Sequence, residues 1–151
     1  MEHQLKKRKR QAYQPTPELQ KDGYLGNNRL LLAHMIATTK GKMSRGEVRS
    51  WFEVNSECFP KSYEDQGISL GECEIDHILP RSLGGVDHPY NYYILPRDIN
   101  RDWSGWWTRE KRSYMGKTNY KKFQHFVLWT TSEAELRRVD YNDFGGFGSF
   151  L

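Results

Sequence analysis

Residues 72–100 read ECEIDHILPRSLGGVDHPYNYYILPRDIN, and this stretch decides the fold. Its first part, 72–78, alternates polar and apolar side chains imperfectly, which predicts a β-strand. A loop rich in proline and glycine follows, and residues 92–95 predict a second strand. Pro96 and the acidic residue after it are typical of a helix start, and the pattern predicts a helix through about Trp103. The expected order is therefore strand, long loop, strand and helix, in an α+β fold.

Polar side chains suited to phosphodiester hydrolysis recur along this stretch at Asp76, His77, Asn91 and Asn100. Cutting a phosphodiester bond needs a group that takes a proton from water and a cation that offsets charge on the phosphate. Adjacent side chains in a strand point to opposite faces, so Asp76 can hold an ion while His77 reaches the water. Taken singly, each residue has an ordinary reading as a surface, turn or helix residue, and only the combined spacing points to chemistry.

The segments DHILPRSLGG at 76–85 and DHPYN at 87–91, followed by Leu95 and Asn100, resemble the HNH endonuclease motif. The resemblance covers about residues 72–105. It implies a ββα-metal core of two short antiparallel strands and a helix, with further helices before and after it. The version that ends in asparagine is similar to the HNH domain of RNA-guided CRISPR effectors.

The resemblance implies a role for each of the four polar residues. Asp76 and Asn100 would be metal ligands, and His77 would be the general base that activates water. Asn91 would hold the loop so that the His77 ring is oriented. In the same loop, Gly84 and Gly85 would permit the turn. His88 is assigned to loop structure in preference to a third ligand or a phosphate contact.

The chain departs from the family pattern at three places. It has no CxxC pair, so no structural zinc is expected. Asn100 replaces the final histidine of many members, which favours Mg²⁺ or Mn²⁺. Trp103, Trp106 and Trp107 follow, and they read either as core or interface anchors or as platforms for unpaired bases. We therefore expect metal-dependent hydrolysis of DNA, with nicking by a monomer, 5′-phosphate and 3′-hydroxyl products, and RNA left open as a substrate.

Residues 1–26 are expected to form a flexible basic arm, because prolines, glycines and charge occur there without apolar periodicity. Its basic residues could contact phosphates, act as a nuclear import signal, or simply keep the chain soluble. They are Lys6, Lys7, Arg8, Lys9 and Arg10. Residues 27–142 are then one nuclease domain. The glycine- and phenylalanine-rich tail at 143–151 is either unstructured or a docking segment.

Helices are expected on both sides of the motif. One covers about 29–39 with Asn27 or Asn28 as its cap, and the next starts at Ser44, which forms a capping box with Glu47. The second of these should bury Val48, Trp51 and Phe52. After the motif, a helix is predicted over about 118–128 and another near Ser132. A helix-turn-helix reading of the first pair is set aside, because no reading-helix pattern follows.

Charge is divided unevenly along the chain. Residues 53–76 carry seven acidic side chains and one lysine, whereas residues 97–122 carry eight basic and three acidic ones. This arrangement suits a carboxylate site beside a surface that attracts phosphates, although both strips also read as ordinary solvated faces. The candidate phosphate contacts of the basic strip are Arg97, Arg101, Arg109, Lys111 and Arg112.

The composition predicts a protein inside the cell. The 151 residues carry a net charge of +4, and no apolar stretch reaches membrane-spanning length. Secretion is not expected, because the N-terminus begins with charged residues and no apolar signal region follows them. Cys58 and Cys73 are expected to be free thiols in the cytoplasm or nucleus. Two alternatives to an independent nuclease stay open: a non-catalytic nucleic-acid-binding module, and a subunit held through its aromatic tail. A homodimer is a further option for cutting both strands.

Overall fold

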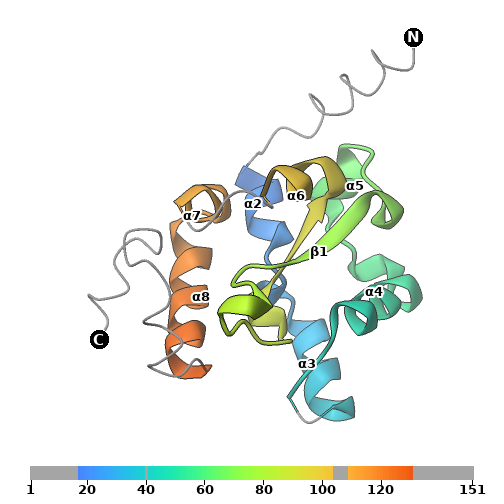
Figure 1. Ribbon diagram of the computed structural model, residues 1–151. Coiled ribbons are helices and arrows are strands. Elements are labelled where there is room, and N and C mark those ends of the chain that lie inside the picture. Colours follow the sequence, from blue (N-terminus) through green and yellow to red (C-terminus); the bar gives the residue numbers. More distant parts are fainter. Residues whose placement is uncertain (1–16, 40, 104–108, 131–151) are drawn as a thin grey trace.

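The computed structural model describes residues 17–39, 41–103 and 109–130 and has an α+β fold (Figure 1). Its helices are α2 (Pro17–Gly23), α3 (Arg29–Thr38), α4 (Arg45–Val54), α5 (Lys61–Asp65), α6 (Arg97–Trp103), α7 (Arg109–Met115) and α8 (Lys117–Thr130). Its strands are β1 (Cys73–His77) and β2 (Tyr92–Pro96). Short 3₁₀ turns lie between them: η1 (Leu25–Asn27), η2 (Ser56–Cys58), η3 (Leu70–Glu72), η4 (Arg81–Leu83) and η5 (Pro89–Asn91).

The two strands form one antiparallel sheet at the centre of the molecule. Ile75 lies opposite Ile94, and His77 lies opposite Tyr92. Since side chains of paired residues share a face and neighbours alternate, His77 projects to one face of the sheet and Asp76 to the other. The predicted order of strand, loop, strand and helix is confirmed, with α6 running over the predicted range.

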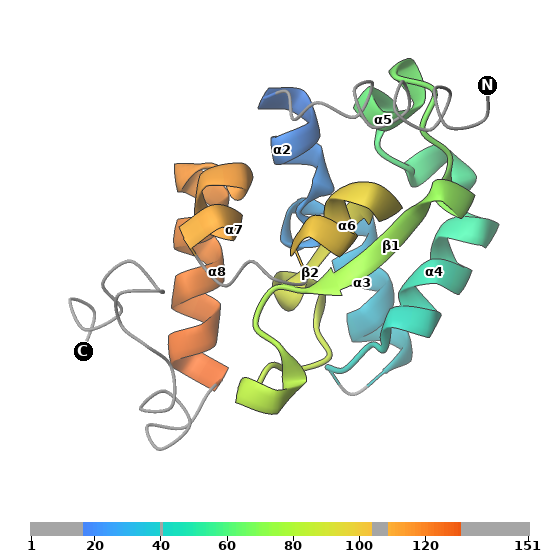
Figure 2. The ribbon, with the colours of Figure 1, turned by 45° about the horizontal axis from the view of Figure 1, so that its top comes forward.

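Each face of the sheet is covered by its own group of helices. Ile75, Tyr92 and Ile94 belong to a core that also takes in side chains of α3, α4 and α5. Tyr93 and Leu95 project the other way, into a second core that includes side chains of α7 and α8. Figure 2 shows α4 beside β1 on one side and the α7–α8 pair on the other. A strand buried on both faces explains why β2 is an unbroken apolar run.

Helices α3 and α4 begin at caps that the sequence predicted. Asn28 caps α3, its side chain accepting a hydrogen bond from the Leu31 backbone N–H at 3.0 Å. Ser44 and Glu47 form a complete capping box at the start of α4, with both hydrogen bonds 3.2 Å long. The predicted apolar face of α4 is also buried, because Val48, Trp51 and Phe52 all lie in the core.

Residues 17–26 correct the prediction of a flexible arm that extends to residue 26. They form α2 and part of η1, and Tyr24 is only 1% exposed. The Tyr24 hydroxyl donates to the carbonyl of Tyr90 at 2.7 Å, and its backbone bridges to Tyr93. Gly26 lies against the Tyr24 ring, where a Cβ would come within 2.5 Å of a ring carbon. Gly26, one of the glycines that suggested a linker, therefore marks close packing against a buried aromatic ring.

Several expectations fall on residues outside the described ranges. These are the basic run Lys6–Arg10, the helix near Ser132, the tail at 143–151, and Trp106 and Trp107. Helices α5 and α7 were not predicted. Cys58 and Cys73 are free thiols, as expected. Among the described helices, none is both long and apolar enough to cross a membrane.

Candidate active site

His77, at the end of β1, is held by a carboxylate from the following loop. Its Nε2 lies 2.8 Å from Oδ1 of Asp87. The same Oδ1 lies 3.1 Å from the hydroxyl of Tyr92, whose ring packs edge-on against the His77 ring with centroids 5.0 Å apart. Arg81 adds a longer ion pair of 3.7 Å to the other Asp87 oxygen. The imidazole is thus fixed in position and in orientation.

This partner determines which nitrogen of His77 can accept a proton. A carboxylate only accepts hydrogen bonds, so in a neutral ring the proton is assigned to Nε2 and the lone pair to Nδ1. Burial lowers the pKa of His77 below its ordinary value, although the hydrogen bond to Asp87 opposes that shift. The ring is therefore neutral at pH 7, with Nδ1 available as a base.

Asn91 is 1% exposed and ties together the loop between the strands. Its Oδ1 accepts from the Leu79 N–H at 2.8 Å, and its Nδ2 donates to the carbonyls of Leu79 and Val86 at 3.1 and 3.0 Å. One side chain therefore joins the segment just after His77 to the segment just before Asp87. These are the loop-holding contacts expected of Asn91.

The rest of the loop is built for tight turns. Gly84 has a φ of +91°, the left-handed conformation expected of a turn glycine. Gly85 is needed for space, because a Cβ there would lie 1.8 Å from the carbonyl oxygen of Leu79. His88 caps η5 by accepting from the Tyr90 N–H at 3.0 Å, and burial lowers its pKa to about 4. The assignment of His88 to loop structure agrees with this contact.

Asp76 lies on the other face of β1, where its carboxylate meets a lysine. Lys111 places its Nζ 3.2 Å from Asp76 Oδ2, and within 3.4 Å of the carbonyls of His77 and Ile78. Burial raises the pKa of Asp76 to about 6, although the Lys111 ammonium lowers it. Lys111 was expected to be a surface contact for phosphate, and that expectation is wrong. Its side chain is 4% exposed because α7 folds back against the strand end.

Asn100 projects from α6 toward β1, where only the nitrogen of its side-chain amide makes a hydrogen bond within the described part of the chain. Its Nδ2 donates to the carboxylate of Glu74, while its buried Oδ1 has no hydrogen-bond partner among the described residues. A buried carbonyl oxygen without a partner is costly, and a cation or a bound water relieves that cost. Oxygen donors are also the ligands that Mg²⁺ prefers. Asn100 Oδ1 is therefore a donor that would suit a hard divalent cation, whereas the Asp76 carboxylate is already paired with Lys111.

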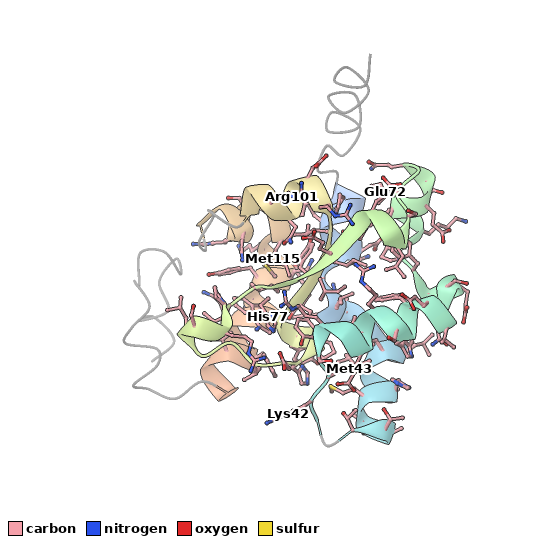
Figure 3. The ribbon with its side chains drawn as sticks, turned by 45° about the vertical axis from the view of Figure 1, so that its right-hand side comes forward. Lys42, Met43, Glu72, His77, Arg101 and Met115 are labelled. Atoms are coloured by element: carbon pink, nitrogen blue, oxygen red, sulfur yellow. The ribbon has the colours of Figure 1, made fainter. Side chains whose placement is uncertain are left out.

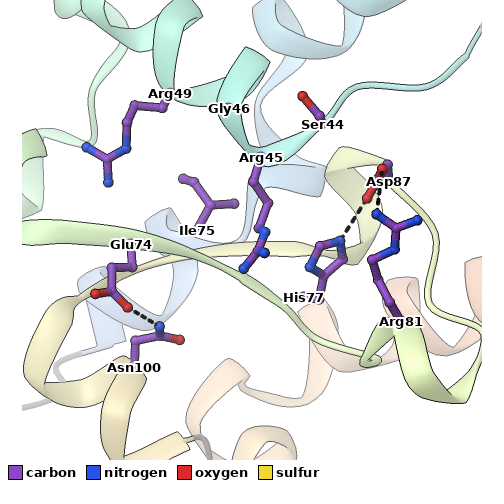
Figure 4. A pocket seen from close by; sticks show the side chains of 10 residues that line it. All are labelled: Ser44, Arg45, Gly46, Arg49, Glu74, Ile75, His77, Arg81, Asp87 and Asn100. Carbon is purple, nitrogen blue, oxygen red and sulfur yellow. Dashed lines mark hydrogen bonds and ion pairs between the residues drawn. The ribbon is translucent and has the colours of Figure 1, made fainter.

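His77 and Asn100 line one cavity of about 490 Å³, open along β1 (Figure 4). Asp76 is not among its lining residues, because its carboxylate points to Lys111 on the opposite face of the strand. The described residues contain no cluster of three or more histidine, cysteine or acidic side chains that could hold a metal. The expected ligand set of one carboxylate and one amide is smaller than such a cluster.

The remaining candidates of the basic strip lie on α6 and α7. Arg97 is ion-paired with Glu74 at 3.2 Å and also donates to the Gly71 carbonyl. Arg101 is exposed on the outside of α6, well away from His77 (Figure 3). Arg112 is exposed and lies over the Tyr120 ring at 5.7 Å. The side chain of Arg109 lies outside the part of the molecule that the structure describes.

Sequence reasoning gave no role to several residues that the fold brings to this cavity. Asp87 is part of the quoted motif, and its spacing from His77 in a loop that returns to the strand end was the available signal. Arg45 and Arg49 come from α4, far upstream, and no local pattern connects them with His77. Comparisons with family models, with curated proteins and with solved structures gave no match.

Proposed function

We propose that this protein is a metal-dependent endonuclease of the HNH type that hydrolyses phosphodiester bonds in DNA and nicks one strand as a monomer. The observation that carries the proposal is the His77–Asp87 pair at the end of β1. It fixes a neutral imidazole in a cavity that also receives Asn100, whose buried Oδ1 has no partner among the described residues. A binding module has no need of a base held in this way.

In the proposed reaction, His77 Nδ1 takes a proton from a water molecule as the water oxygen attacks phosphorus. The new bond joins that oxygen to phosphorus, and the bond from phosphorus to O3′ breaks. The departing O3′ takes a proton from solvent, so the products carry a 5′-phosphate and a 3′-hydroxyl. Asp76 and Asn100 would hold Mg²⁺ or Mn²⁺, which when bound supplies positive charge against the phosphate and leaving oxygens. Asp87 accepts a hydrogen bond from Nε2, so Nδ1 carries no proton before the attack and keeps its orientation as it takes one.

The second candidate is a non-catalytic nucleic-acid-binding module with the same fold, and the Lys111–Asp76 ion pair favours it. A lysine 3.2 Å from the proposed ligand already neutralises that carboxylate. In this reading the cation site is replaced by Lys111, and His77 and Asp87 only brace the loop. The two candidates differ in one measurable property: the nuclease cuts DNA when Mg²⁺ is present, whereas the binding module does not cut DNA with or without Mg²⁺.

The deciding experiment is nicking of supercoiled plasmid by the purified full chain in Mg²⁺ or Mn²⁺. His77→Ala is compared with His125→Ala, which removes an exposed histidine on α8. We expect wild type and His125→Ala to nick only with metal, and His77→Ala to bind the plasmid without nicking it. Equal nicking by wild type and His77→Ala would contradict the role of His77. No nicking by wild type in either metal would favour the binding module.

A further inference from the structure

One arginine in the His77 cavity has no partner in the described part of the molecule. Arg45 is the first residue of α4, and its side chain reaches from there toward β1, between His77 and Asn100 (Figure 4). Its guanidinium makes no hydrogen bond and no ion pair with any group that the structure describes. It nevertheless lies close enough to act electrostatically on Asp76, His77 and Tyr92.

The other two arginines that line the cavity are already engaged. Arg49 donates from both terminal nitrogens to the carbonyls of Leu70 and Cys73. Arg81 is paired with Asp87 at 3.7 Å. The acidic lining residues are also matched, since Glu74 binds Arg97 and Asn100 while Asp87 binds His77. A fork of donors is therefore left facing the cavity, with no carboxylate committed to it.

Backbone contacts fix Arg45 relative to the imidazole. The Met43 N–H donates to the Asp87 carbonyl at 2.9 Å, and the Tyr92 hydroxyl donates to the Met43 carbonyl at 2.7 Å. The capping box of Ser44 and Glu47 then sets the first turn of α4. The chain that enters α4 is thus hydrogen-bonded to Asp87, the residue that orients His77. The same contacts therefore position the backbone of Arg45 and the ring of His77.

On these grounds, and resting on the proposed function, we propose that Arg45 is a catalytic residue that donates hydrogen bonds to the non-bridging oxygens of the phosphodiester that is cleaved. A planar guanidinium matches two phosphate oxygens at once and keeps its charge at any working pH. Placed beside His77, it would bind the negative charge that builds on the phosphate as water attacks. The helix before the motif would then complete the active site.

The test compares Arg45→Ala and Arg45→Lys with Arg29→Ala, using the full chain. Arg29 is a matched control, because it is the exposed first residue of α3 and does not line the cavity. Single-turnover nicking should fall about 100-fold or more in Arg45→Ala, as for loss of one donor to a charged transition state. Arg45→Lys should keep part of the rate, Arg29→Ala should match wild type, and DNA affinity should change only a few-fold.

A second readout separates this inference from the nuclease proposal. The side-chain Nε–H signal of Arg45, assigned by its loss in Arg45→Lys, is followed by NMR while a short DNA duplex is added without metal. We expect a saturable shift of that signal and none for Arg29. A signal that does not shift overturns the inference, even if the protein nicks DNA. A wild-type nicking rate in Arg45→Ala also overturns it. If wild type does not nick at all, the nuclease proposal fails and a saturable shift still supports Arg45 as a phosphate contact.

Discussion

Asn91 should be the most stability-sensitive polar residue of the loop between the strands. Asn91→Ala removes all three of its side-chain hydrogen bonds and leaves the buried Leu79 N–H without its acceptor. An unsatisfied buried polar group costs about 1–3 kcal/mol, and the two carbonyls that lose a donor add to this. We expect a loss of about 2–4 kcal/mol in the free energy of unfolding. In a chain of this size that corresponds to a fall in Tm of roughly 10 °C.

Denaturant and thermal unfolding in chelator-containing buffer measure this loss, with Asn55→Ala as the control. Asn55 donates a single local hydrogen bond to Trp51, so its replacement should cost less than about 1 kcal/mol. Asn91→Asp is a second probe. It keeps the acceptor for Leu79 but turns a carboxylate oxygen toward two carbonyls, which raises the pKa of the new carboxyl above its unfolded value. The free energy of unfolding of Asn91→Asp should then fall as pH rises from the unfolded pKa of that carboxyl to its higher folded pKa. Asn91→Ala within about 1 kcal/mol of wild type, or Asn91→Asp as stable as wild type at pH 8, would refute the reasoning.

Two further changes probe the neighbouring contacts. Lys111→Met leaves the Asp76 carboxylate buried and unpaired, so it should cost roughly 3 kcal/mol at pH 8. Because the pKa of Asp76, already raised to about 6, rises further without the ammonium, the loss should be smaller at pH 5, where the carboxyl is protonated. Urea unfolding at the two pH values measures this, and the pH dependence should vanish in an Asp76→Asn background. Gly85→Ala should lower stability by about 1–3 kcal/mol, because its Cβ meets backbone at 1.8 Å. Gly71→Ala, whose nearest atom is 3.9 Å away, should change little, and equal melting temperatures for the two would contradict the steric argument.

The sequence was sufficient where local interactions determine the structure. Both capped helices, the strand pair and α6 depend on patterns a few residues long, such as Ser44 with Glu47, and these were predicted. The loop-holding role of Asn91 was implied by the family resemblance, and its partners lie within the same loop. Residues 17–26 were misread because Tyr24 finds its partners at Tyr90 and Tyr93. Burial of an aromatic ring by distant residues outweighs a local signal for a flexible arm.

Lys111 shows why charge alone could not identify the site. As one of several basic residues in a strip, it reads like its neighbour Arg112. Only the return of α7 to the strand end distinguishes them, since it buries Lys111 against Asp76 and leaves Arg112 exposed. The same limit applies to Arg45, whose approach to His77 depends on a hydrogen bond between Met43 and Asp87. Contacts over such separations leave no periodicity in the sequence.

The alternation of β1 has a consequence for how much of the chain the proposed reaction needs. Asp76 and His77 are neighbours, yet their side chains lie on opposite faces of the strand and their pKa values are shifted in opposite directions. Burial raises the pKa of the acid and lowers that of the base. Lys111 from α7 lies against Asp76 on one face, and Arg45 from α4 lines the cavity beside His77 on the other. A fragment that runs only from β1 to α6 would lack the positive side chains of both Lys111 and Arg45. We infer that the helices on either side of the motif belong to the working site as well as to the core.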